Sequence, residues 1–196
     1  ILGGGTVGTA AAKIAVGLGA TVSILDVSIP RLEYLDDIFG ARVNLLYSNR
    51  DTISEEVIRA DLVVGAVLLP GGRAPTLVTH DLVRAMEPGS VIMDVAIDQG
   101  GCIETIHGTT HDAPTYVVDG VLHYGVTNMP GAVAHTSTFA LTNATMPYAA
   151  RIADHGVIEA TRLEPSLRGG LNVAAGRVCH EAVAKSLGLK YEPADL

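Results

Sequence analysis

Two short stretches of this chain combine residue types that could do chemistry. The first is Gly3-Gly4-Gly5-Thr6-Val7-Gly8, which has the spacing G-x-G-x-x-G and is followed eighteen residues later by Asp26. Glycines at this spacing let a tight turn approach a pyrophosphate, and an acid at the end of the next strand accepts hydrogen bonds from a ribose 2′-hydroxyl. The same acid repels a 2′-phosphate, so the pattern favours NAD over NADP. Chance could also produce such a turn, but here the full order of turn, helix, strand and acid is present.

The second stretch is Asp98-Gln99-Gly100-Gly101, which follows the apolar run 90–95. A carboxylate at this point would lie near the nicotinamide end of a dinucleotide. There it could order the nicotinamide ribose, act on a substrate amine, or do both. An ordinary Asp turn accounts for the same residues equally well. Asn128 follows another predicted strand and has a similar pair of interpretations, either a ligand contact or a loop former before Met129-Pro130-Gly131.

Alternating strands and helices must position these residues. The sequence predicts helices over 9–19, 31–39, 52–59 and 79–86, and strands over 20–26, 42–48, 61–68 and 90–95. Asp119-Gly120 joins two further apolar runs, 115–118 and 121–126, as a hairpin would. This rhythm predicts right-handed βαβ units and a Rossmann-type, doubly wound parallel α/β sheet. Ligands of such sheets bind beyond the carboxyl ends of the strands, so the candidates follow the strands: the glycine turn, Asp26, Ser48, Val67-Leu68 and 96–101.

The strand rhythm stops after Gly131. The remaining sequence predicts a helix over 136–155 that is kinked or divided at Pro147, a loop over 162–171 and a helix over 176–187, with no strand partner. We therefore expect an NAD-binding Rossmann domain over 1–132 and a helical segment over 133–196 that belongs to a second domain. Only Ile1-Leu2 precede the glycine turn and there is no initiator Met, so we expect a piece of a longer protein with an incomplete first strand.

Composition narrows the class of protein. The 196 residues are 48% hydrophobic, which fits buried parallel strands. The sequence contains no run of 18 uninterrupted apolar residues, so it does not predict a membrane-spanning helix. The net charge of −8 and the absence of a Lys/Arg cluster argue against a nucleic-acid partner. Two cysteines make neither a disulfide framework nor a metal motif, so a cytoplasmic protein without a bound metal is expected.

Several blocks resemble the alanine dehydrogenase family. Besides the glycine turn, they are Gly65-Ala66-Val67-Leu68-Leu69-Pro70-Gly71 with Ala74-Pro75, Asp94 to Cys102, Asn128-Met129-Pro130, Thr136-Ser137-Thr138, and Ala140 to Tyr148. The Ala-Ile-Asp-Gln-Gly-Gly and Leu-Thr-Asn-Ala-Thr blocks are the specific ones, and the resemblance covers nearly the whole chain. Ala134-His135 and Ile106-His107-Gly108 depart from the family pattern, which affects local loop geometry rather than the class of reaction.

The resemblance implies NAD-dependent, reversible oxidative deamination of L-alanine to pyruvate and ammonia, with Asp98 as the catalytic acid and Asn128 beside the substrate. It also implies a cofactor site made of Gly3, Gly5, Thr6, Val7, Gly8, Asp26, Arg31, Ser48, Val67, Leu68, Val95, Ala96, Ile97, Asp98, Val126, Asn128 and Met129. The family's substrate-binding Arg and Lys and its catalytic His belong to an N-terminal domain outside this sequence, so the isolated chain is expected to be inactive. Family members are usually homohexamers. The alternatives are the NAD-binding subunit of a proton-translocating transhydrogenase and a non-catalytic NAD-binding fragment.

Overall fold

The computed structural model describes residues 1–69, 72 and 74–194, which form two compact units. The first holds residues 1–69 and 74–129, and the second holds Gly72 and residues 130–194. Pro70 and Gly71, which belong to one of the blocks quoted above, lie outside the described residues.

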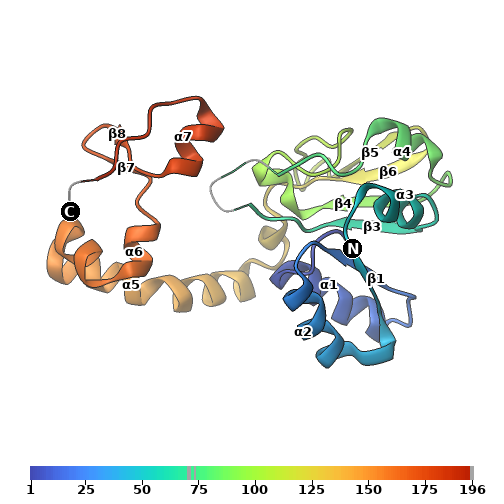
Figure 1. Cartoon of the computed structure of the whole chain (residues 1–196), viewed down its shortest axis with the longest axis horizontal. Helices are drawn as coiled ribbons and strands as arrows, with labels where there is room; N and C mark the ends of the chain where they lie inside the picture. The colour runs from blue at the N-terminus through green and yellow to red at the C-terminus, as the bar shows by residue number, and fades with distance from the viewer. Residues whose placement is uncertain (70–71, 73, 195–196) are drawn as a thin grey trace. The chain divides into compact units, whose positions relative to one another are not determined.

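The first unit is built on a mostly parallel sheet (Figure 1). Its strands are β1 (Ser23–Asp26), β2 (Asn44–Tyr47), β3 (Leu62–Gly65), β4 (Val91–Asp94), β5 (Thr115–Val118) and β6 (Val121–Tyr124). β1 and β2 pair in parallel, as do β3 and β4, and β4 and β6, whereas β5 pairs antiparallel with β6. Leu2 bridges in parallel to Leu25 on one side and to Gly65 on the other, so the chain start joins β1 to β3. The predicted Rossmann-type arrangement is confirmed.

Helices cover both faces of this sheet because successive strand residues point to opposite sides. The helices are α1 (Thr6–Gly17), α2 (Ile29–Phe39), α3 (Arg50–Ile58) and α4 (His80–Ala85). Ile24 packs in a core with Ala12 of α1 and Leu35 of α2, whereas the adjacent Leu25 packs in the other core, which contains Val57 of α3 and Val83 of α4. One strand thus supplies both cores, as a doubly wound fold requires.

The start of α3 differs from the sequence expectation. The sequence predicted a helix from residue 52, but the helix begins at Arg50 and its N-cap is Asn49. The Asn49 side chain accepts a hydrogen bond from the Thr52 N–H at 2.9 Å. Asn satisfies a free first-turn N–H as well as Thr does, so the helix gains two residues.

The second unit contains α5 (Ala134–Leu163), α6 (Pro165–Gly169), α7 (Glu181–Leu187) and a short antiparallel hairpin of β7 (Val173–Ala174) and β8 (Arg177–Val178). Three expectations for this region were wrong. The backbone stays helical through Pro147, so the helix is not divided there; it is interrupted at Gly156, directly after the predicted helix end at 155, and the φ of 74° at this residue suits glycine. The expected loop over 162–171 contains α6. The hairpin, whose turn has positive φ at Ala175 and Gly176, adds strands where none were expected. Among the described residues, no helix is both long and apolar enough to cross a membrane.

Candidate cofactor-binding site

The three glycines of the turn have three different surroundings. Gly3 adopts a φ of 98°, in the left-handed region that suits glycine. A side chain at Gly8 would overlap the carbonyl oxygen of Gly3, so this glycine lets α1 pack against the turn. A Cβ at Gly5 would meet no described atom within 4 Å. A tight turn, close helix packing and an open side are the features by which a dinucleotide-binding turn accepts a pyrophosphate.

Helix α1 presents free backbone donors on the open side of the turn. Its N-cap, Gly5, provides no side-chain cap, and its first turn contains no acidic residue. The first N–H groups of a helix have no intrahelical partner, and the helix dipole favours a negative group there. The fit to a dinucleotide pyrophosphate therefore rests on both the open face of Gly5 and the uncapped end of α1.

Asp26 lies at the end of β1, directly beside the turn. Its Oδ2 accepts a hydrogen bond from the Gly4 N–H at 2.7 Å, and its Oδ1 accepts one from the Ser28 N–H at 2.8 Å. A carboxylate has about four acceptor positions, so two remain for the hydroxyls of a ribose. Asp26 can therefore hold the turn in place and accept hydrogen bonds from a ligand at the same time.

Arg31 braces the same turn from α2. Its Nε donates to the Gly4 carbonyl at 2.5 Å, and its Nη2 donates to Thr9 Oγ1 at 2.7 Å. The guanidinium also lies 4.8 Å from the centre of the Tyr34 ring. The family resemblance implied that Arg31 lies near the cofactor, and the structure gives it partners in the turn itself.

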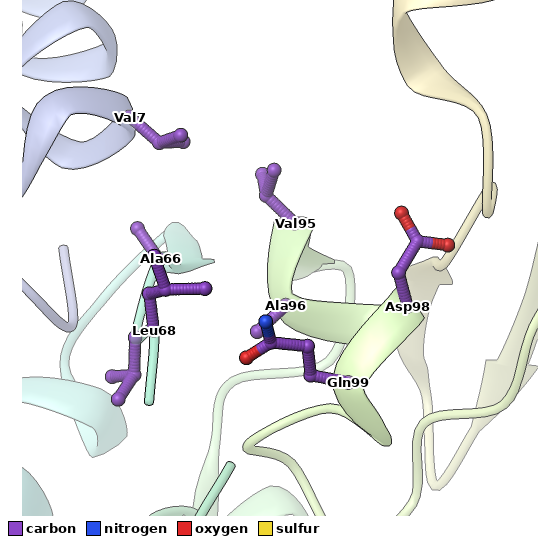
Figure 2. A pocket seen from close by; sticks show the side chains of 8 residues that line it. Val7, Ala66, Leu68, Val95, Ala96, Asp98 and Gln99 are labelled. Carbon is purple, nitrogen blue, oxygen red and sulfur yellow. The ribbon is translucent and has the colours of Figure 1, made fainter. Parts of the chain in front are cut away.

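A cleft of about 190 Å³ opens next to the turn. Three segments form it: Val7 of α1, the residues that follow β3, and η2 (Val95–Gln99), the 3-10 turn after β4. Figure 2 shows Val7 directed into the space, and Val95 and Asp98 projecting from one side of η2. The Gln99 amide turns back toward the wall made by Ala66 and Leu68. The lining is mainly apolar, as suits a flat aromatic ring, with one carboxylate and one amide at its η2 side.

Six of the residues predicted for the cofactor site line this cleft: Val7, Val67, Leu68, Val95, Ala96 and Asp98. Gln99, which the sequence indicated as a candidate within 96–101 but not among the cofactor contacts, also lines the cleft, and so does Ala66, which the sequence reasoning missed. Ala66 directly follows β3 and Gln99 ends the 95–99 turn, and these positions were the signal that the sequence offered for placing them at the site. The Gln99 Oε1 atom is buried without a hydrogen-bond partner among the described residues, so it is a free acceptor in the wall of the cleft.

The other predicted site residues do not line this cleft. Ile97 and Val126 are buried, and Ser48 donates its N–H to the Asp26 carbonyl at 2.9 Å. Asn128 is exposed, and its carbonyl oxygen lies 2.7 Å from His111 Nε2. Met129 begins a separate 3-10 turn, η3 (Met129–Val133).

Several known proteins are similar to this chain in sequence. Residues 1–181 match the family model described as "Alanine dehydrogenase/PNT, C-terminal domain". The chain is 58% identical to the alanine dehydrogenase of Bacillus subtilis (strain 168) and 60% identical to that of Methanococcus maripaludis, in each case over its full length and 52% of the relative. The chain therefore spans about half the length of the curated relatives it matches.

Two solved structures are also similar. An L-alanine dehydrogenase matches with a TM-score of 0.83 and 56% identity, covering 95% of this chain and 52% of the other. A transhydrogenase from Sinorhizobium meliloti matches with a TM-score of 0.63 and 29% identity, covering 70% of this chain and 40% of the other.

Proposed function

Because the chain belongs to the alanine dehydrogenase/PNT C-terminal domain family, we propose that it is the cofactor-binding half of an NAD-dependent L-alanine dehydrogenase. The C-terminal domain of this family is the NAD-binding domain. The reaction would convert L-alanine, NAD and water to pyruvate, ammonium, NADH and a proton, and would run in both directions. The observation that carries the proposal is the apolar cleft that opens beside the glycine turn and has Asp98 in its lining.

Bound NAD would supply the acceptor for a hydride that leaves the substrate Cα. The residues of this chain would bind and orient the two reactants. The end of α1 and the turn at Gly5 would hold the pyrophosphate, and Asp26 would hold the adenosine ribose. Val7, Val67 and Val95 would enclose the nicotinamide and exclude water from its face.

Asp98 would hold or move a proton at the substrate. Its carboxylate is exposed at the η2 side of the cleft, and no hydrogen bond or ion pair within the described part of the chain engages it. Oxidative deamination replaces an amino group by a carbonyl oxygen, so protons must be moved at nitrogen and oxygen next to the Cα. Asn128 would assist from the loop that follows β6.

A transhydrogenase subunit is the weaker alternative. The similar transhydrogenase is 29% identical to this chain, whereas the similar alanine dehydrogenase structure is 56% identical over more of it. Both classes would bind a dinucleotide, so cofactor binding alone does not distinguish them. Turnover of pyruvate and ammonium with NADH distinguishes the dehydrogenase from the transhydrogenase subunit.

The test follows the absorbance of NADH with pyruvate and ammonium, using the full-length enzyme that contains this domain. We expect turnover, and we expect Asp98→Asn to lower kcat about 100-fold or more, the usual contribution of a general acid or base. NADH affinity should change little, because the substitution keeps the shape of the side chain. Asp112→Asn, an exposed acid outside the cleft, is the matched control.

Each outcome is decisive. A full-length enzyme that binds NADH but does not consume it with pyruvate and ammonium would refute the activity. Normal turnover in Asp98→Asn would refute the role of Asp98. The 196-residue chain alone should bind NADH without turnover, and turnover by it would disprove the need for a second domain.

Oligomerisation is a further part of the proposal. The long helix α5 leaves large apolar side chains exposed, among them Phe139, Leu141 and Met146. Side chains of this kind on one helix favour burial against protein. We expect the full-length enzyme to be a cytoplasmic homohexamer, and a monomer in light scattering would contradict the assembly.

A further inference from the structure

The Asp94 carboxylate is buried directly before η2, which forms one wall of the cleft, and the functions proposed above do not use it. Asp94 is the last residue of β4 and has no exposed surface. Its Oδ1 accepts a hydrogen bond from the Ala96 N–H at 2.9 Å, and its Oδ2 accepts one from the Cys102 N–H at 2.7 Å. One side chain therefore closes both ends of the segment 95–101.

The neighbouring backbone fits closely around this carboxylate. Gly65 of β3 pairs in register with Asp94, and a Cβ at Gly65 would stand 2.7 Å from Asp94 Oδ1. A Cβ at Gly101, whose φ is 72°, would stand 2.9 Å from Oδ2. Both distances are too short for a real carbon–oxygen contact. Two glycines therefore make the space that the carboxylate fills.

The same contacts connect the two walls of the cleft. Gly65 directly precedes Ala66, Val67 and Leu68, which form one wall. Asp94 directly precedes Val95, and the segment that it closes contains Asp98 and Gln99 of the other wall. The Asp94 carboxylate thus accepts hydrogen bonds from backbone N–H groups on both sides of Asp98, those of Ala96 and Cys102.

The surroundings of Asp94 indicate that this side chain does more than fill space in the core. Burial raises the pKa of this carboxyl, while the backbone N–H groups of Cys102 and Ala96 counteract that effect. A buried polar group is costly unless its hydrogen bonds are made. An apolar residue would fill the space at lower cost, so the donors aimed at Asp94 indicate that its acceptors serve the segment around it.

We propose that Asp94 is a positioning residue that fixes the conformation of residues 95–101 and thereby places Asp98 in the cleft. The meaning of that placement rests on the function proposed above. The contacts to Ala96 and Cys102 do not, and they can be tested without any ligand.

The test compares Asp94→Asn with Val83→Ala. Asn keeps the shape of Asp but replaces one oxygen by an NH2 group, so either Ala96 or Cys102 must face another donor. Val83 is fully buried in the same core, on α4, and does not line the cleft, so its truncation controls for general loss of stability. Three readouts are needed: amide hydrogen exchange over 96–102, NADH affinity of the chain, and kcat and KM of the full-length enzyme.

We expect Asp94→Asn to lower exchange protection at Ala96 or Cys102 about tenfold, the effect of one hydrogen bond to a charged group. NADH affinity and kcat should fall by a similar factor, with little change in KM for pyruvate. Val83→Ala should lower stability without these changes. The proposal is overturned if the two variants match in NADH affinity and kcat, or if both amides keep their protection. If the wild-type chain fails to bind NADH, the proposed function fails instead, and the exchange data alone decide the role of Asp94.

Discussion

Replacing Gly5 by Ala separates binding from folding within the glycine turn. Gly5 has a φ of −64°, which Ala adopts freely, and a Cβ there meets no described atom within 4 Å. A Gly-to-Ala change at a compatible site stabilises a protein by about 0.4–1 kcal/mol, because it restricts the unfolded chain. The free energy of unfolding should therefore stay constant or rise slightly.

The same methyl group would stand where a pyrophosphate must approach the backbone. Losing one hydrogen bond to a charged phosphate costs about 1.5–3 kcal/mol, which corresponds to about 10- to 150-fold in Kd. We expect NADH affinity to fall by that factor in Gly5→Ala. Gly8→Ala should instead lose both affinity and stability, by about 1–3 kcal/mol for the overlap with the Gly3 carbonyl.

Fluorescence titration with NADH and urea denaturation measure the two quantities. Gly17→Ala is the control, because Gly17 is also open but lies at the far end of α1. It should leave NADH affinity unchanged. If Gly5→Ala binds NADH as tightly as the wild type, the turn does not hold the pyrophosphate and the assignment of the site is wrong.

Two further predictions concern Asp26 and His123. Asp26→Ala should weaken NADH binding about tenfold or more and reduce the preference for NADH over NADPH, since it removes both an acceptor for the ribose and the bond to the Gly4 N–H. Titrations with both dinucleotides measure this, with the exposed Asp37→Ala as the control, and an unchanged preference would refute the ribose contact. His123 is fully buried, and burial lowers its pKa from the ordinary value, so the unfolded chain binds the proton more readily. Stability should therefore fall as the pH drops through about 6.5, the usual pKa of an unfolded-chain histidine, and His123→Gln should flatten that part of the profile. If the free energies of unfolding of the wild type and His123→Gln, measured in urea, depend on pH in the same way between pH 5 and 7.5, the prediction for His123 is wrong.

The sequence predicted the order of turns, helices and strands in the first domain because each of these signals involves neighbouring residues. The glycine spacing, the acid at the end of the next strand and the Asp119-Gly120 turn, whose two residues both have positive φ, need only a few adjacent positions. Helix ends were less readable, because Asn49 and Thr52 are both residue types that cap helices, and the structure shows that α3 uses Asn49. The region after Gly131 was least readable, since its apolar helices have no pattern that fixes their limits.

The sequence alone determined the parallel α/β class and the candidate phosphate turn, because hydrophobic rhythm and glycine spacing reflect backbone conformation directly. Only the tertiary structure showed that Ala66 and Gln99 line the cleft, that Leu2 bridges Leu25 and Gly65, and that Asp94 is enclosed by Gly65 and Gly101. These contacts join residues from different strands and from the loops that follow them. Such pairings depend on the register of the sheet, which no single stretch of sequence contains.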